Sequence, residues 1–476
     1  MEDVFLCGKP AFTCPLPHIL MEEGRLSEMD FLGIFESTTF LLLLMAGVWF
    51  TARMKFYPIV HLGEVFRRTI GGFANKDGKS KKGFSSFEAA ATSLAGTMGT
   101  GNIVGVAAAL AAGGPGAVLW MIIGALMGMA VKYAEIVLGI LYRRKNNAGE
   151  FRGGPMYYME SGLNWKHMAK FFALLCAVSA IGVGNMTQVN AAAGAIYTSS
   201  PVHFPIWLIG LGMALFCGLV CAGGMGRIGK VTAFIMPVIS LGYLAGCLWV
   251  ILCCRRELPA VLLEIWEGAF GIRPMASGLM GLSIVKAVRF GLARGIFSHE
   301  AGLGSAPIAH GGAVCNSPQE QGLWGMLEVF WDTVIGCTTT ALVLLLAAPE
   351  GLAGGLEDVR WTSEAFSRWF GTAGDWFVSV SLAVFAAAAL VSWWLYGSQA
   401  VEYLAGGDGG KNDRWQKWYL WLYLGASVIG SAVKMSTVWK ISDFLNCLMI
   451  LPNLAALVML AGKVGNPPER RKDKLE

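Results

Sequence analysis

Charged residues are scarce in this sequence. They make up 14% of the 476 residues, whereas soluble domains contain about 25%. Apolar residues account for 55% of the chain, and they gather in runs near the length of about 20 residues that crosses a bilayer. The composition therefore excludes an ordinary soluble domain. It predicts an all-α polytopic membrane protein whose outer surface contacts the lipid bilayer.

Motifs for metal binding and for export are missing as well. The 11 cysteines are scattered along the chain, with only Cys253 and Cys254 adjacent, and no Cys-x-x-Cys or His-Glu-x-x-His spacing occurs, so we expect no metal cofactor. Residues 1–35 lack the basic start and short apolar core of a cleaved signal peptide. The net charge of +5 is too small to indicate nucleic acid as a partner. Cys7 and Cys14 pair only if the N-terminus faces an oxidising compartment, and two free thiols are an equal alternative.

Hydropathy divides the chain into eleven predicted spans. With the N-terminus outside, the inner loops carry 24 Lys and Arg residues and the outer segments carry 9. Because basic residues gather on the cytoplasmic side, we predict an outer N-terminus and a cytoplasmic C-terminus. The predicted spans are 38–58, 87–112, a third ending at 141, 168–196, 205–221, 229–254, 275–312, 322–347, 375–404, 415–433 and 439–462.

The second predicted span is interrupted. Its segment Ser93–Gly105, with the sequence SLAGTMGTGNIVG, holds Gly96, Gly99 and Gly101 among hydroxyl and amide side chains. Each glycine costs a helix interior about 1 kcal/mol relative to alanine, so the segment predicts a break. Amide groups at the start of the second half-helix attract a carboxylate, and carbonyls at the end of the first half hold a small cation. A glycine-rich face for close helix packing is the alternative.

A second interruption, Gly291–Pro307, falls in the seventh span. The two interrupted spans are five apart, which is an odd number, so they cross the membrane in opposite directions. That geometry is typical of two inverted repeats of five helices each. The predicted division is an N-terminal extracytoplasmic segment (1–36), an extra helix with a basic cytoplasmic linker (37–86), the first repeat (87–256), the second repeat (257–462) and a cytoplasmic tail (463–476).

Several long motifs follow one another between residues 87 and 403: GTGNIVGVAAALAAGGPGAVLW, FRGGPMYYMESGL, GNMTQVNAAA, GMGRIGKVTAFIMP, RGIFSHEAGLGSAPIAH and EVFWDTVIGCTTTALV. In content and order they resemble the bacterial and archaeal alanine or glycine:cation symporter family. The resemblance implies a symporter, not an enzyme, that imports alanine, glycine or a similar small neutral amino acid with Na⁺ as the coupling ion. It also implies a LeuT-like five-plus-five inverted repeat preceded by one extra helix, in the cell (inner) membrane.

The first break suits an amino acid. Its amides suit the carboxylate of the substrate, and its carbonyls suit an ammonium group or Na⁺. The resemblance points to the same segment, and Gln188 matches a family glutamine that contacts substrate. Hydrogen bonding between helices is the alternative for Gln188. For Trp393, a packing or lipid-facing role is the alternative. The predicted substrate-binding residues are Thr97, Thr100, Gly101, Asn102, Gln188, Phe297 and Trp393.

Four ionisable residues within the predicted spans are candidates for gating or coupling. Intramembrane charges are costly and mark functional sites or internal ion pairs, and Arg294 with Glu300 is one candidate pair. The family usually has asparagine at the position of His299, so both a titrating histidine and a neutral, hydrogen-bonded one are open. Asp332 lies near a boundary, pairs with a basic residue, or helps to hold a cation.

Other polar residues in the spans have structural interpretations. Lys132 and Glu135 are three apart on one helix face and are expected to pair with each other. Asn190 is balanced between packing and function. The hydroxyls of 338–340 are as well suited to carbonyls of their own helix as to a ligand.

One departure from the family concerns sodium. The resemblance implies two adjacent hydroxyl residues where this chain has Ala388 and Ala389, which offer no side-chain oxygen to Na⁺. The remaining sodium candidates are the carbonyls of Ala95 and Met98 and the hydroxyl of Ser392. A proton-coupled transporter of the same fold is therefore an alternative, with a titrating group among His299, Glu300 and Asp332. A channel or leak pathway is the alternative from another class, and the sequence makes no prediction of oligomeric state.

Overall fold

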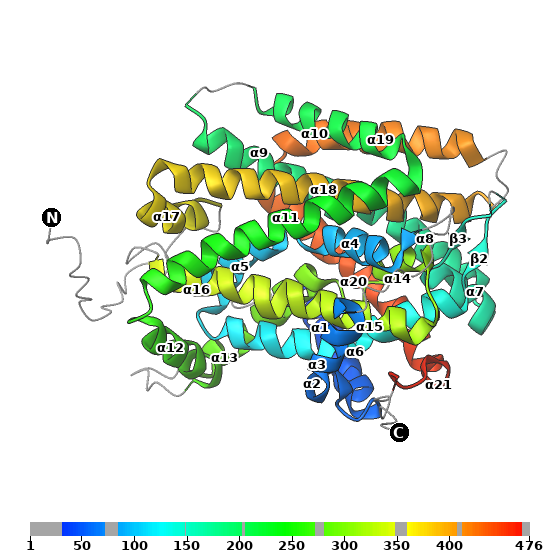
Figure 1. Ribbon diagram of the computed structural model, residues 1–476, viewed down its shortest axis with the longest axis horizontal. Helices are drawn as coiled ribbons and strands as arrows, with labels where there is room; N and C mark the ends of the chain where they lie inside the picture. The colour runs from blue at the N-terminus through cyan, green and yellow to red at the C-terminus, as the bar shows by residue number, and fades with distance from the viewer. Residues whose placement is uncertain are drawn as a thin grey trace, which may run out of the picture.

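The computed structural model describes residues 31–71, 84–147, 149–201, 205–271, 280–347, 359–406 and 412–468. Cys7, Cys14, the rest of the predicted N-terminal segment before residue 31 and the tail after residue 468 lie outside the described residues. The described chain is helical, apart from two short strand pairs. Figure 1 shows most of the long helices running along one common direction.

Each of the eleven predicted spans contains helix in the residues that the structure describes. Seven described helices are long and apolar enough to cross a membrane, and the bent α4–α5 pair raises this number to eight. The other three spans are the short α10, the interrupted α13–α14 and the more polar α19. The span helices are α1 (Phe31–Arg53), α4 (Ser86–Thr97), α5 (Val106–Gly113), α6 (Ala117–Leu141), α8 (Lys166–Ile181), α9 (Thr187–Ser199), α10 (Ile206–Cys221), α11 (Gly224–Cys253), α13 (Met280–His299), α14 (Ala306–Gly311), α15 (Pro318–Val329), α16 (Thr338–Ala347), α18 (Thr372–Leu404), α19 (Asn412–Ala432) and α20 (Met435–Met459).

Shorter elements lie between the spans. Helix α12 (Leu258–Phe270) follows α11. Strand β1 (Phe84–Ser85) pairs in parallel with β4 (Ala313–Val314), which ties the start of α4 to the end of α14. Strands β2 (Arg144–Lys145) and β3 (Phe151–Arg152) form an antiparallel pair. The short helices are α2 (Tyr57–Val60), α3 (Leu62–Thr69), α7 (Pro155–Leu163), α12 (Leu258–Phe270), α17 (Val359–Phe370) and α21 (Ala461–Val464), and π-helical segments span Gly101–Gly105, Gly182–Met186 and Phe330–Cys337.

The two interrupted spans run in opposite directions, as predicted. In Figure 1 the chain passes from right to left along α4 and α5, whereas it passes from left to right along α13 and α14. Helices at equivalent positions of the two halves also pack against each other: α6 against α15, α8 and α9 against α18, and α10 against α19. Such pairing is what an inverted repeat produces, with the two breaks near its centre.

Local sequence signals explain where the key half-helices begin. The Ser85 side chain accepts the N–H of Glu88, and the Glu88 side chain accepts the N–H of Ser85, so a complete capping box starts α4. Ser317 caps α15 in the same way by accepting the N–H of Glu320, and Pro318 occupies the first turn. Both helices therefore have fixed starting points at the same end of the molecule.

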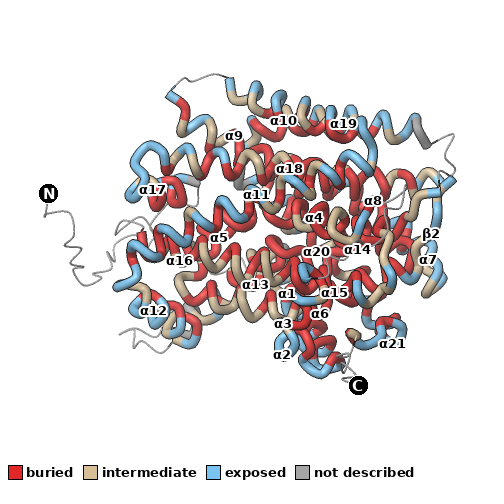
Figure 2. Tube along the Cα trace, in the orientation of Figure 1, coloured by how far each residue is buried: buried red, intermediate tan, exposed pale blue. Residues whose placement is uncertain are grey.

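Burial separates a protein-facing centre from a lipid-facing exterior. Figure 2 shows mostly buried residues along α4, α6 and the second half of α18, while α10, α11 and α19 expose one side. Large apolar residues lie on these exposed sides, such as Leu219 (70% exposed) and Phe234 (73%). A soluble protein rarely leaves such residues uncovered, so these surfaces fit contact with lipid tails.

Candidate functional site

The first predicted break is present at the centre of the molecule. Helix α4 ends at Thr97, a π-helical segment starts at Gly101, and the two halves of the span are bent by 50°. The backbones approach closely here, because a Cβ on Gly101 would lie 3.1 Å from the Cα of Ser298. The first break therefore lies directly against α13, the helix that leads into the second break.

Side chains replace a backbone hydrogen bond that the first break opens. In a continuous helix the N–H of Thr100 would donate to the carbonyl of Gly96. Instead, Thr100 N–H donates to Gln188 Oε1 at 3.0 Å, and Trp393 Nε1 donates to the Gly96 carbonyl at 3.2 Å. Both side chains are buried. The structure thus brings Thr100, Gln188 and Trp393 together. The carboxamide oxygen of Gln188 occupies the Thr100 N–H, which is the donor that the sequence assigns to a substrate carboxylate.

Asp332 lies in a cluster of polar groups that joins the two broken helices. Asn102 Nδ2 donates to its Oδ1 at 2.9 Å, and the hydroxyls of Ser298 and Thr333 each donate to its Oδ2 at 2.7 Å. The Asn102 side chain also accepts the N–H of Gly99 at 3.1 Å, so it is fixed to the first break. The Asp332 carboxylate is fully buried, and no Lys, Arg or His of the described chain forms an ion pair with it. Its charge therefore lacks a protein cation.

Charged groups of α6 stabilise the second break. Glu300, Gly302 and Gly304 have φ values of 54°, 87° and 84°, so the chain leaves helical geometry between α13 and α14. Glu135 accepts the N–H groups of Gly302 at 3.1 Å and Gly304 at 2.9 Å. Lys132 Nζ donates at 3.0 Å to the carbonyl of the last residue of α13. An anion before one half-helix and a cation after the other complement the helix dipoles.

The prediction that Lys132 pairs with Glu135 is wrong. Lys132 Nζ lies 3.3 Å from Glu328 Oε2 on α15. Glu328 also accepts the hydroxyl of Ser93 at 2.7 Å and contacts His310 Nε2 at 2.7 Å. Spacing along one helix predicts pairing on an exposed face, but these residues face peptide groups that the second break leaves unpaired. Satisfying those buried groups outweighs a contact between neighbours.

The candidate pair of Arg294 with Glu300 is also wrong. Arg294 donates to both carboxylate oxygens of Asp443 on α20, at 2.7 and 3.4 Å. Glu300 instead accepts the hydroxyl of Ser305 at 2.5 Å. Six residues of helix turn two side chains to different faces, and Glu300 already lies beyond the end of α13. The Arg294–Asp443 pair therefore links the first half of the second interrupted span to the last span.

Aromatic rings lie between this ion pair and the first break. The ring centres of Phe297 and Trp439 are 4.6 Å apart, and the Arg294 guanidinium lies 4.5 Å from the Trp439 ring. A Cβ on Gly101 would lie 3.4 Å from Phe297, and one on Gly105 would lie 3.8 Å from Trp439. Phe297 thus lies against the first break, and its role in substrate binding stays a prediction. Trp439 lies beside it and was not among the predicted residues.

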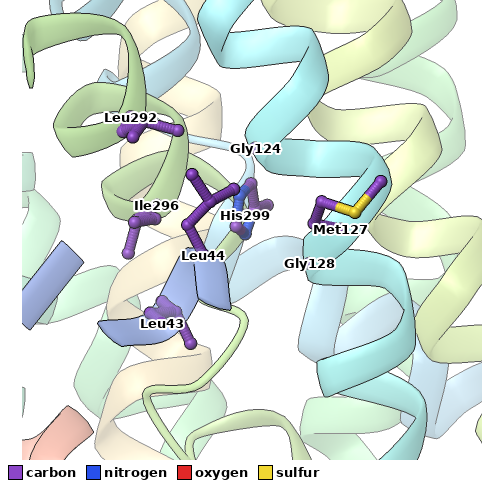
Figure 3. Close-up of a pocket in the computed structure, with 8 residues that line it drawn as sticks. All are labelled: Leu43, Leu44, Gly124, Met127, Gly128, Leu292, Ile296 and His299. Atoms are coloured by element: carbon purple, nitrogen blue, oxygen red, sulfur yellow. The ribbon is translucent and has the colours of Figure 1, made fainter. Parts of the chain in front are cut away.

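His299 faces a small, mostly apolar cavity. Its Nδ1 accepts the N–H of Ala301 at 3.1 Å, and its buried Nε2 has no hydrogen-bond partner in the described chain. The cavity of about 10 Å³ has room for one water molecule. Figure 3 shows His299 between side chains of α1, α6 and α13. No acid lines this cavity, so its surroundings favour the neutral histidine.

The residues predicted from the sequence to bind sodium differ in whether their oxygens already have a hydrogen-bond partner. Ser392 Oγ donates to the carbonyl of Ala388 in its own helix at 3.2 Å. Ala388 and Ala389 are buried and contribute only methyl groups. The carbonyl of Ala95 has lost its usual helical partner, because the N–H of Gly99 donates to Asn102. Met98 follows the last residue of α4 and has extended backbone geometry.

Two further predicted residues make structural contacts. Thr97 donates to the carbonyl of Leu94 in its own helix at 3.0 Å. Asn190 donates to the carbonyls of Gly430 and Val433, both at 2.7 Å, and so links α9 to the end of α19. The Asn190 bonds are packing interactions of the kind that buried amides make between membrane helices, whereas the Thr97 bond stays within α4.

The model of the sodium:alanine symporter family matches residues 29–469. The chain belongs to the sodium:alanine symporter family. It is 37% identical over 430 residues to the sodium/alanine symporter AgcS of Methanococcus maripaludis, covering 89% of this chain and 91% of that protein. It is 39% identical over 444 residues to an uncharacterized transporter of Haemophilus influenzae, covering 92% and 93%.

Solved structures confirm the fold. MhsT in complex with L-phenylalanine superposes with a TM-score of 0.57 at 12% identity, covering 80% of this chain and 90% of that chain. At this identity the likeness shows the fold alone, which is the predicted LeuT-like arrangement. The predicted family of sodium-coupled amino-acid symporters is confirmed too, so this symporter is a multi-pass transporter and not an enzyme.

Proposed function

We propose that this symporter imports alanine, glycine or a similarly small neutral amino acid with Na⁺, by alternating access across a bacterial or archaeal (inner) membrane. The observation that carries the proposal is the bond from Thr100 N–H to Gln188 Oε1 at the first break. A substrate carboxylate is the same kind of acceptor with a full charge, and helix-terminal amides bind it more strongly. Displaced from the amide, Gln188 then contacts the substrate. The name of AgcS, a sodium/alanine symporter, supports this substrate class.

The surroundings of the first break support a small, neutral side chain. Phe297 packs against Gly101, and the fully buried Trp393 covers the opened Gly96 carbonyl. We therefore expect these rings to favour a small side chain. A charged side chain would need a counter-charge, and the nearby Asp332 carboxylate already accepts three side-chain hydrogen bonds.

We place the coupling Na⁺ at the Asp332 cluster. Hard cations take oxygen ligands, and this cluster offers the carboxylate of Asp332 and the hydroxyls of Ser298 and Thr333. Asn102 turns its Nδ2 toward this carboxylate and so holds it against the first break. A buried carboxylate without a cation is costly, so binding Na⁺ removes that cost. Because Asn102 belongs to the first break, the ion and the substrate share one segment, which couples their binding.

The second candidate for the Na⁺ site is the set of carbonyls and hydroxyl predicted from the sequence, formed by Ala95, Met98 and Ser392. The opened Ala95 carbonyl supports it, while the methyl groups of Ala388 and Ala389 oppose it. Proton coupling is the alternative that Asp332 itself supports, because protonation neutralises a buried carboxylate as a cation does.

Two ionic clusters on opposite sides of the breaks fit alternating access. Arg294 and Asp443 join α13 to α20 on the side that we propose faces outside. Lys132, Glu328 and His310 join α6, α15 and α14 on the other side. Opening one cluster while the other stays closed exposes the central site to one side at a time.

Uptake of radiolabelled alanine into proteoliposomes tests the proposal. An inward Na⁺ gradient is compared with a Na⁺-free pH gradient, for the wild type, Asp332→Asn and the control Asp375→Asn. Asp375 lies in the first turn of α18 and accepts the Ser367 hydroxyl, away from both breaks. We expect Na⁺-dependent uptake that Asp332→Asn lowers at least about tenfold, an energetic effect of about 1.4 kcal/mol, and that Asp375→Asn preserves. Uptake driven by the pH gradient alone would overturn sodium coupling, and folded protein without alanine uptake would overturn the substrate class.

A further inference from the structure

A second cavity, of about 380 Å³, lies near one end of the molecule. It is formed around β2, β3 and α7, at the right-hand end of Figure 1 and away from both breaks. Four cationic side chains and two carboxylates line it: Arg144, Lys145, Arg152, Lys170, Glu160 and Glu402. The lining therefore carries an excess of two positive charges.

Both carboxylates of this cavity already have partners. Glu402 accepts hydrogen bonds from Arg152 Nε at 2.9 Å and from Gln416 Nε2 at 3.3 Å. Glu160 accepts from Arg144 NH1 at 3.3 Å and from the hydroxyl of Tyr403 at 3.0 Å. Arg152 also pairs with Glu150, outside the lining, at 2.8 Å. Both arginines are thus neutralised by acids, and the positive charge without a paired acid belongs to the lysines.

Lys145 and Lys170 have no carboxylate partner. Lys145 Nζ lies 5.1 Å from the ring centre of Phe151, and neither lysine forms an ion pair with any residue that the structure describes. An ammonium group provides three donors and no acceptor. The cavity therefore offers two uncompensated charges and a set of donors to an anion, and a phosphate group has the matching acceptors.

The cavity lies at the level of a membrane–water boundary. Helix α19 begins beside it, since Gln416 donates to Glu402. Trp415 and Trp418, on the same turn of α19, are 62% and 66% exposed. Exposed tryptophans mark the depth of the lipid headgroups in membrane proteins. The cavity is therefore placed where headgroup phosphates lie.

An apolar face of α8 leads away from the cavity. Phe171, Leu174 and Val178 are 45%, 52% and 45% exposed. Their spacing, together with that of Lys170, places all four residues on one face of the helix. A lipid bound by its phosphate at Lys170 would lay its acyl chains along this face, which a soluble phosphate would leave unused.

We propose that the cavity binds the phosphate of an anionic phospholipid, held by Lys145 and Lys170. Basic pockets at the edges of membrane helices are known to bind such headgroups. The shared chemistry is a phosphate group, and the apolar face of α8 favours the lipid over a free phosphate. The cavity joins β2, β3, α7, α8 and α18, so an occupied site stabilises the packing of these elements.

The test uses the full chain in detergent, with lipid binding followed by native mass spectrometry and by melting temperature. Phosphatidylglycerol, phosphatidylcholine and inorganic phosphate are added separately to the wild type, to K145Q/K170Q and to the control K166Q/K230Q. Lys166 and Lys230 are exposed and lie outside the cavity lining. Two lysine charges at about 1 kcal/mol each correspond to an affinity loss of about 30-fold.

We expect phosphatidylglycerol to bind and stabilise the wild type and the control, and to bind K145Q/K170Q about 30-fold more weakly. The single variant K170Q gives an intermediate loss if the double variant is too unstable to purify. Equal binding of phosphatidylglycerol by the double variant overturns the site. Equal stabilisation by inorganic phosphate, with the same dependence on the lysines, overturns the lipid assignment in favour of a soluble anion.

Discussion

Replacing Gly99 with alanine tests the first break through a backbone position. A Cβ at Gly99 would lie 2.5 Å from Gln188 Oε1, whereas ordinary contacts are 3.4–4 Å. The carboxamide must therefore move by about 1 Å, a shift that removes its 3.0 Å hydrogen bond to Thr100 N–H. A buried donor left without a partner costs about 1–3 kcal/mol. We therefore expect Gly99→Ala to lower the melting temperature of the substrate-free protein.

We also expect transport to change in this variant, because the displaced Gln188 would lose the substrate contact that we propose. A loss of about 1–3 kcal/mol corresponds to a rise of about 5- to 150-fold in the KM for alanine uptake. Gly105→Ala is the matched control on the same span, because its Cβ meets Trp439 at an ordinary 3.8 Å. In the Gln188→Ala background, Gly99→Ala should have little further effect. Gly99→Ala with the KM of the control, or effects that add in the double variant, would refute this account of the break.

Three further predictions concern the charged groups around the breaks. Lys132→Met leaves Glu328 buried without the Lys132 cation, so we expect a loss of about 3–5 kcal/mol in stability, measured as a lower melting temperature. The double variant K132M/E328Q should restore part of that loss. A K132M melting temperature equal to that of the wild type would contradict the ion pair. Glu135→Gln sets an NH₂ group against backbone N–H donors of the second break, so uptake should fall while its dependence on Na⁺ concentration stays unchanged; an altered Na⁺ dependence would instead place this carboxylate in ion binding. Arg294→Asp and Asp443→Arg should each slow alanine uptake, and the double variant should recover part of it. The interaction free energy between the two substitutions should be about 0.5–3 kcal/mol. Additive losses would show that the two residues do not act as a pair.

The positions of both breaks could be predicted from the sequence. Glycines and short polar side chains inside an apolar span weaken the helix locally. This effect can be recognised in the sequence without knowledge of the neighbouring helices. Gly99 and Gly101 mark the first break in this way, and Gly302 and Gly304 mark the second with left-handed backbone geometry. The family and the LeuT-like fold were confirmed, whereas the orientation in the membrane, the boundaries of the repeats and the binding roles stay predictions.

The partners of the charged groups could not be predicted from spacing. Lys132 and Glu135 share a helix face, but each meets peptide groups or acids of other elements that only the folded chain brings near. Ser298 was missed because a single serine beside a break has no distinguishing pattern. Asp443 could have been recognised from the sequence, because a carboxylate within an apolar span is costly unless a basic residue such as Arg294 pairs with it.

The most direct test of the central claim is whether alanine carries sodium with it. Proteoliposomes are prepared with equal Na⁺ inside and outside and without alanine, and the entry of radioactive Na⁺ is measured with and without alanine added outside. We predict alanine-dependent Na⁺ entry in the wild type and in Asp375→Asn, and its loss in Asp332→Asn. Alanine entry that brings no Na⁺ into the vesicles would contradict the proposed coupling and the role of Asp332 in it.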